Sequence, residues 1–167
     1  MRADVSPRRS IEGGFFLIEA MVAILIFALG ILGLVAMGGT AVASQSDAQY
    51  RTEASSLADA IAGEIALNIN RTSEAAKFTS LAQFSHQPTV TGYCDFTGTV
   101  AANAVVKGII DRAANLTPSI GMPGASAAMQ QVVVAPAGTF NRVEITLCWK
   151  TASDSAPRKH TLVTYVN

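Results

Sequence analysis

The sequence predicts an α+β protein in which one long N-terminal helix packs against a C-terminal antiparallel β-sheet. Two observations lead to this prediction. An apolar run without charge or proline extends from Ala20 to Ser46, and an apolar stripe at helical spacing follows it. The C-terminal third instead has apolar side chains at every second position, which is typical of half-buried strands.

The N-terminal apolar run has the length of a membrane span. It exceeds the roughly 20 residues that cross a hydrocarbon core about 30 Å thick. Glu19 is the only acidic residue of the segment and lies at its edge. Arg2, Arg8 and Arg9 precede the run, and arginines favour the cytoplasmic side. The C-terminal part is therefore expected on the outer side of the membrane.

Two general interpretations of this run remain open. A secretory signal peptide would be cut after a small-residue site, and Ala41, Val42 and Ala43 fit one. The run is, however, about twice as long as the 7–15 residues usual for a signal-peptide core. A plain transmembrane anchor accounts for the length but not for Glu19 or for the glycine pair before Phe15.

The helix is expected to continue beyond the apolar run, from Phe15 to about Asn70. Apolar residues recur there at spacings of three and four, with charged side chains between them. The stripe consists of Tyr50, Ala54, Leu57, Ile61, Ile65 and residues 67–69. This second half is therefore amphipathic and presents one face to a core. At 1.5 Å per residue, the whole helix would be about 84 Å long.

The middle of the chain predicts two short helices and a loop. The first helix covers residues 73–84 with Ser73 as its N-cap, and the second covers residues 103–116 and ends before a proline. Residues 86–98 between them predict a loop that carries Cys94. The side chains expected to face the core are Phe78, Leu81, Phe84, Val106, Ile109, Ile110 and Ala113.

Three strands are predicted near the C-terminus, over residues 131–135, 142–150 and 160–166. A turn at residues 136–138 and a polar loop at residues 151–158 connect them. In the central strand Val143, Ile145, Leu147 and Trp149 alternate with Glu144, Thr146, Cys148 and Lys150. We expect the first set to pack on the helical stripe around Leu57, Ile61 and Ile65.

Cys94 and Cys148 are the only two cysteines. If the apolar run carries the rest of the chain across a membrane, both reach an oxidising compartment and can pair. Cys148 is expected on the face of its strand opposite to the core, so the bridge would fasten residues 71–130 to the outer face of the sheet. The alternative is two separate small hydrophobic side chains.

The sequence does not predict an enzyme. Neither a nucleophile elbow nor a phosphate-binding glycine loop nor a cluster of metal ligands is present, and no cofactor is indicated. His86 and His160 are isolated, and Asp154 lies with two serines in a stretch typical of a solvated loop. The chain has 12 lysines and arginines and 12 acidic residues, and the basic residues form no cluster in the sequence. A nucleic-acid-binding surface is therefore not indicated.

One short motif is more specific. Gly14 is followed by Phe-Phe-Leu-Ile-Glu-Ala-Met-Val-Ala-Ile-Leu, which resembles the N-terminus of type IV prepilins and pseudopilins. The resemblance implies that a membrane peptidase cuts between Gly14 and Phe15 and methylates the amine of Phe15. It also implies that Glu19 serves assembly. Residues 1–14 would then be a leader, residues 15–46 a membrane and filament-core helix, and residues 47–167 a periplasmic head.

The resemblance further implies a pilin-like fold and a structural role. Because the Cys148–Trp149 strand near the end is similar to that of PilV-type minor pilins, we expect a minor pilin in pilus assembly or priming, and hence adhesion or twitching motility. Its partners would be other minor and major pilins, the prepilin peptidase, the inner-membrane assembly machinery and, before assembly, membrane lipid. The alternatives are a minor pseudopilin of a type II secretion system and a secreted enzyme or binding domain released after Ala43.

Overall fold

The computed structural model describes residues 13–114, 121–135 and 140–166, with side chains from Phe16 onward. The protein is α+β, as predicted, with a long N-terminal helix and a three-stranded antiparallel sheet near the C-terminus. The chain divides between Ser46 and Asp47 into two compact units. We describe each unit by itself.

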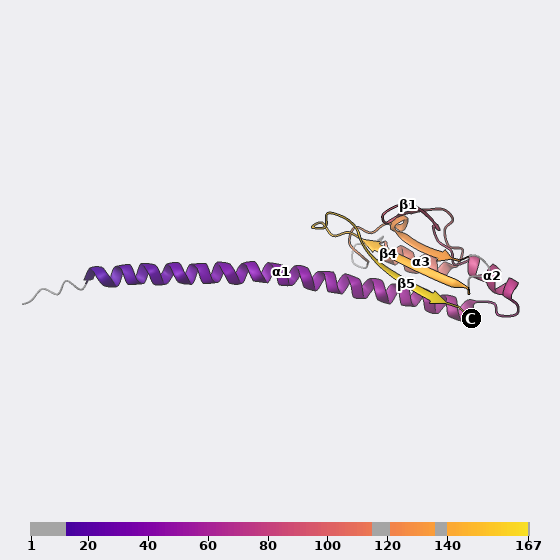
Figure 1. The fold of residues 1–167 in the computed structure, drawn as a ribbon, viewed down its shortest axis with the longest axis horizontal. Coiled ribbons are helices and arrows are strands. Elements are labelled where there is room, and N and C mark those ends of the chain that lie inside the picture. Colours follow the sequence, from indigo (N-terminus) through magenta and orange to yellow (C-terminus); the bar gives the residue numbers. More distant parts are fainter. Residues whose placement is uncertain (1–12, 115–120, 136–139, 167) are drawn as a thin grey trace, which may run out of the picture. The chain divides into compact units, whose positions relative to one another are not determined.

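Helix α1 (Gly13–Asn68) is a single helix of 56 residues, which confirms the predicted extent to within two residues at each end (Figure 1). Two side chains at its C-terminal end bond to helix carbonyl groups. Asn68 donates to the Glu64 carbonyl at 3.1 Å, and Arg71 donates to the Ala66 carbonyl at 2.6 Å. The Ala66 carbonyl is one of the last four of the helix, for which no helix amide is left as a partner, so Arg71 supplies a donor.

The first unit, as far as it is described, consists of the part of α1 up to Ser46. No side chain from Phe16 to Gln45 is buried, and the large hydrophobic ones are 45–76% exposed. An 18-residue window of this helix reaches a mean hydropathy of 2.8, which makes α1 long and apolar enough to cross a membrane. Because leaving apolar surface in water costs a free energy of about 25 cal/mol per Å², this part of α1 is expected to be buried in lipid or against another protein.

The second unit is built on a sheet with strand order β3-β4-β5, in which every pair is antiparallel. Its strands are β3 (Gln130–Val134), β4 (Arg142–Trp149) and β5 (Arg158–Tyr165). The predicted inner face of β4 is confirmed: Val143, Ile145, Leu147 and Trp149 are each 0% exposed. They share one core cluster with Leu57, Ile61 and Ile65 of α1.

Leu67 departs from the prediction for the helical stripe. Its side chain is 81% exposed, whereas Ile65 and Ile69 on either side of it are buried. A residue two positions from Ile65 lies about 200° around a helix of 3.6 residues per turn, so it faces away from the core. The stripe therefore passes from Ile65 to Ile69 without Leu67.

Helices α2 (Glu74–Ala82) and α3 (Ala104–Ala113) form where they are predicted. Ser73 caps α2 by accepting from the Ala76 amide at 3.1 Å, and Asn103 caps α3 by accepting from the amides of Val105 and Val106. Among the predicted inward side chains Leu81, Phe84, Val106, Ile110 and Ala113 are buried, and Phe78 and Ile109 are half-buried. The expected stop at Pro118 and the turn at residues 136–138 lie outside the described residues.

The loop prediction for residues 86–98 is partly wrong. A small hairpin forms there from β1 (Thr89–Gly92) and β2 (Asp95–Thr97), with Cys94 in the turn at φ +57°. All four residues of β1 are exposed, so no alternation of apolar residues marked it as a strand. A polar pair of strands this short depends on outside support.

The Cys94–Cys148 disulfide supplies that support and confirms the predicted pairing, with the two Cα atoms 5.9 Å apart. Together with Phe96, the bridge forms a second small buried cluster, against which Met129 packs. Met129 belongs to a 3₁₀ turn, η1 (Ala127–Met129), directly before β3. As expected, the bridge attaches the middle of the chain to the face of β4 opposite to the main core.

Candidate functional site

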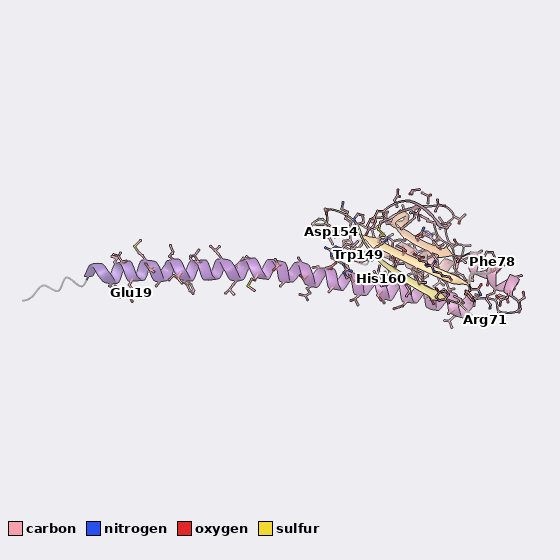
Figure 2. The ribbon with its side chains drawn as sticks, viewed as in Figure 1. Glu19, Arg71, Phe78, Trp149, Asp154 and His160 are labelled. Atoms are coloured by element: carbon pink, nitrogen blue, oxygen red, sulfur yellow. A yellow bond between two sulfur atoms is a disulfide. The ribbon has the colours of Figure 1, made fainter. Side chains whose placement is uncertain are left out.

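The residues expected to serve processing and assembly lie at the start of α1. Gly14 and Phe15 are within its first turn, and Glu19 follows one helical turn after Phe15. Glu19 is exposed and is the only charged residue between Phe16 and Ser46 (Figure 2). No described residue forms an ion pair or a hydrogen bond with its carboxylate, which lies on an otherwise apolar stretch of α1.

A network of four charged residues lies where the second unit begins. Asp47 and Arg51, one turn apart on α1, form an ion pair at 3.0 Å. Arg158, the first residue of β5, also pairs with Asp47 and binds Asp154 through two nitrogens at 3.0 and 2.8 Å. The network thus ties the start of β5 to α1. Sequence reasoning missed it, because nothing in the sequence pairs Asp47 with an arginine more than 100 residues later.

Asp154 belongs to this network through Arg158 and is not simply a solvated loop residue, which corrects the prediction. Its side chain is 8% exposed and accepts from both the amide and the hydroxyl of Thr151, at 3.0 and 2.7 Å. Arg158 and then Thr151 lower the pKa of Asp154 to about 2. The pKa of Asp47 is lowered as well, chiefly by Arg51.

In the Asp154→Asn variant, the free energy of unfolding is expected to fall less steeply as the pH is lowered below 5. An acid whose pKa falls on folding stabilises the folded state above its ordinary pKa of 3.8, and this contribution is lost as the pH falls through about 2. Denaturant midpoints between pH 5 and pH 2 measure it. Asp95→Asn is the matched control, since the Asp95 carboxylate has no ion pair among the described residues. If the denaturant midpoints of the two variants fell equally steeply with pH, the stabilising role of the Asp154 carboxylate would be contradicted.

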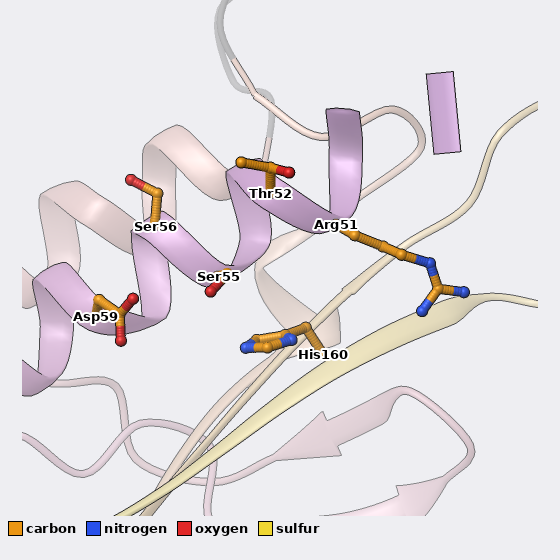
Figure 3. Close-up of a pocket in the computed structure, with 6 residues that line it drawn as sticks. All are labelled: Arg51, Thr52, Ser55, Ser56, Asp59 and His160. Atoms are coloured by element: carbon orange, nitrogen blue, oxygen red, sulfur yellow. The ribbon is translucent and has the colours of Figure 1, made fainter. Parts of the chain in front are cut away.

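An open groove of about 560 Å³ lies beside this network within the second unit. Arg51, Thr52, Ser55, Ser56 and Asp59 of α1 line it together with His160 of β5. Figure 3 shows the imidazole of His160 beneath the α1 turns that carry Ser55 and Asp59. His160 therefore lies on a strand, as the third-strand prediction placed it, and not in the loop-like setting expected of both histidines. It faces a polar surface rich in hydroxyl groups. Within the described ranges, no three His, Cys, Asp or Glu side chains gather into a metal-binding group.

His86, predicted in a loop-like setting, is instead buried and structural. Its side chain is 2% exposed, and its Nδ1 accepts from the Ala101 amide at 3.3 Å. Its backbone exchanges two hydrogen bonds of 2.9 Å with Val132 of β3. Burial lowers the pKa of His86, which keeps the ring neutral near pH 7. The burial followed from this bridge, which the sequence did not reveal.

Comparisons of the chain with models of known protein families, with curated proteins and with solved structures find no match. The functional argument therefore depends on the geometry above and on the motif that begins at Gly14.

Proposed function

We propose that the protein is a minor type IV pilin of the PilV type, cut between Gly14 and Phe15 and built into a pilus through α1. One observation supports the proposal most directly. A single helix carries an exposed apolar surface from Phe16 to Ala43 and then becomes the core helix of a folded unit. The exposed apolar surface of such a helix would be buried in membrane lipid before assembly and against neighbouring helices afterwards.

Small residues on α1 fit close packing between helices. Apart from the chain neighbours and the adjoining backbone of α1, a Cβ atom added at Gly30, Gly33, Gly38 or Gly39 would meet no described atom within 4 Å. The open space over these glycines would let a neighbouring helix approach closely, and close approach at small residues is a main source of helix association in lipid. Larger residues there would keep neighbouring helices apart.

Glu19 would fix the axial position of neighbouring helices relative to one another. An acid in an apolar environment costs about 2.5–3.5 kcal/mol near the centre of a bilayer and less at its edge, so it favours a site with a cation. The amine of Phe15, exposed by cleavage, is such a cation, on the same chain or on a neighbour. Helix packing that brings a Phe15 amine to Glu19 would align subunits axially. The protein would then prime or cap assembly together with other pilins and the inner-membrane machinery, and through that support adhesion or twitching motility.

Mass spectrometry of the N-terminus of the protein from cell envelopes tests the proposal. The expected mature chain begins at Phe15 with one added methyl group. Gly14→Val is expected to leave the leader uncut, whereas Gly13→Val, the matched control, is cut normally. A mature chain that begins at Ser44 would support a secreted domain instead, and an uncut chain that begins at Met1 would support a plain anchor.

A further inference from the structure

The two outer strands of the sheet differ in how their edges are covered. Val132 of β3 directs its amide and carbonyl away from β4, and His86 binds both. The edge of β3 is thereby covered at Val132, in the middle of the strand. Strand β5 pairs with β4 on one side, and on its other side no described residue pairs with it.

The register identifies the groups on the free edge of β5. The Val166 amide donates to the Asn141 carbonyl at 3.2 Å, so Asn141 and Val166 form a hydrogen-bonded pair. In an antiparallel ladder such pairs alternate with pairs whose amides and carbonyls point outward. Val143–Thr164, Ile145–Leu162 and Leu147–His160 are therefore bonded pairs. The residues with outward-pointing groups are Lys159, Thr161, Val163 and Tyr165.

These four residues present a free hydrogen-bonding edge. All four are exposed, and no described residue donates to or accepts from their backbone groups. Unpaired strand edges are templates for a strand of another chain, and proteins usually cover or interrupt them. Neither proline nor a bulge interrupts β5 over its eight residues.

The groove beside β5 adds charge and spacing to this edge. Arg51 and Asp59 lie two helical turns apart, about 12 Å along α1. Side chains four positions apart on one face of a strand are separated by about 13 Å. Between the two charges lie the hydroxyl groups of Thr52, Ser55 and Ser56. Among the described residues Asp59 has no ion-pair partner, and Arg51 keeps 58% of its side chain exposed beside Asp47.

We propose that the free edge of β5 binds an extended segment of another polypeptide as a fourth strand. The side of that segment that faces the groove would carry an acidic residue for Arg51, polar residues for the serines, and a basic residue for Asp59. Main-chain hydrogen bonds would provide affinity, and alternate side chains would provide specificity. This inference goes beyond the proposed function and depends only on the second unit.

Amide hydrogen exchange on the full chain, first purified in detergent and then in envelope complexes, tests the pairing without any substitution. In the purified chain, the amides of Thr161, Val163 and Tyr165 are expected to exchange fast, and those of Leu162 and Thr164 slowly. In the complexes, the first three are expected to slow at least tenfold. Unchanged fast exchange of these three amides in the complexes would overturn the proposal.

Photocrosslinking in intact cells identifies the occupant. With a benzophenone side chain in place of Tyr165, the expected adduct joins the chain to an extended segment with an acid and a base four positions apart. Val163→Pro removes one outward amide and is expected to lower the yield about tenfold, whereas Val163→Thr keeps that amide and the yield. Intact disulfide and protease resistance show that the proline variant is folded.

Three results of the crosslinking would overturn the proposal. They are an adduct made of two copies of this chain, a crosslink to a helical segment, and a yield that Val163→Pro leaves unchanged. All three can be obtained from a chain that begins at methylated Phe15. Failure of this inference is therefore distinct from failure of the proposed function.

Discussion

Replacing Glu19 with alanine is expected to abolish incorporation into pili while cleavage after Gly14 continues. In the assembled state Glu19 would face apolar helices, and a neighbouring Phe15 amine would compensate its charge. Removing one partner of a buried ion pair costs about 3–5 kcal/mol, because the remaining charge stays buried without compensation. Since 1.4 kcal/mol is a factor of ten, incorporation should fall at least about a hundredfold.

Immunoblots of sheared pili and of membrane fractions measure how much of the variant is incorporated. Two further variants serve as comparisons. Glu19→Asp keeps the charge and should retain part of the incorporation. Thr40→Ala is the control on the same apolar helix, because the Thr40 hydroxyl bonds only the Met37 carbonyl within its own helix. Pili that contain the Glu19→Ala variant at the normal level would show that Glu19 has no role in assembly.

Removing the Cys94–Cys148 bridge is expected to lower the free energy of unfolding by about 4 kcal/mol. The two cysteines are 54 residues apart, and closing a loop of that length lowers the entropy of the unfolded chain by about this amount in the chain-entropy model. The double variant Cys94→Ala and Cys148→Ala avoids leaving polar groups in the small cluster around Phe96. The hairpin β1–β2 should be the first part to lose protection, because its own side chains are mostly exposed.

Denaturant unfolding of the full chain in detergent measures the loss, followed by the fluorescence of Trp149, the only tryptophan. The unmodified chain with reductant is the matched comparison and should lose a similar amount. A loss below about 1 kcal/mol would mean that the unfolded chain is already compact enough for the bridge to constrain it little.

The parts of the fold that depend on local periodicity could be predicted from the sequence. The stripe from Ala54 to Ile65 recurs at three and four residues, and β4 alternates, so both buried faces follow from the pattern. The cap Ser73 followed in the same way from side-chain chemistry next to a helical run. Each of these signals lies within about a dozen neighbouring residues.

The features that sequence reasoning missed arise from residues that meet only in the folded chain. The hairpin of β1 and β2 has no apolar alternation and is held by a disulfide to a strand about 50 residues away. Arg158 meets Asp47 because β5 returns to α1, and His86 is buried because its backbone pairs with Val132 at the edge of β3. The free edge of β5 was missed for the same reason, since it depends on the order of strands in the sheet.

The disulfide also determines how far the protein can stretch when it is pulled. A subunit in a retracting filament carries tension, and a chain under tension lengthens by about 3.4 Å for each residue that unravels. The covalent bond between Cys94 and Cys148 keeps the 54-residue segment between them from extending. It therefore shortens the maximum length of the unravelled chain by about 180 Å. Strand β4 ends one residue beyond Cys148, so nearly the whole central strand lies within the shielded loop. Under load, the oxidised protein would behave as a short tether and the reduced protein as a long one.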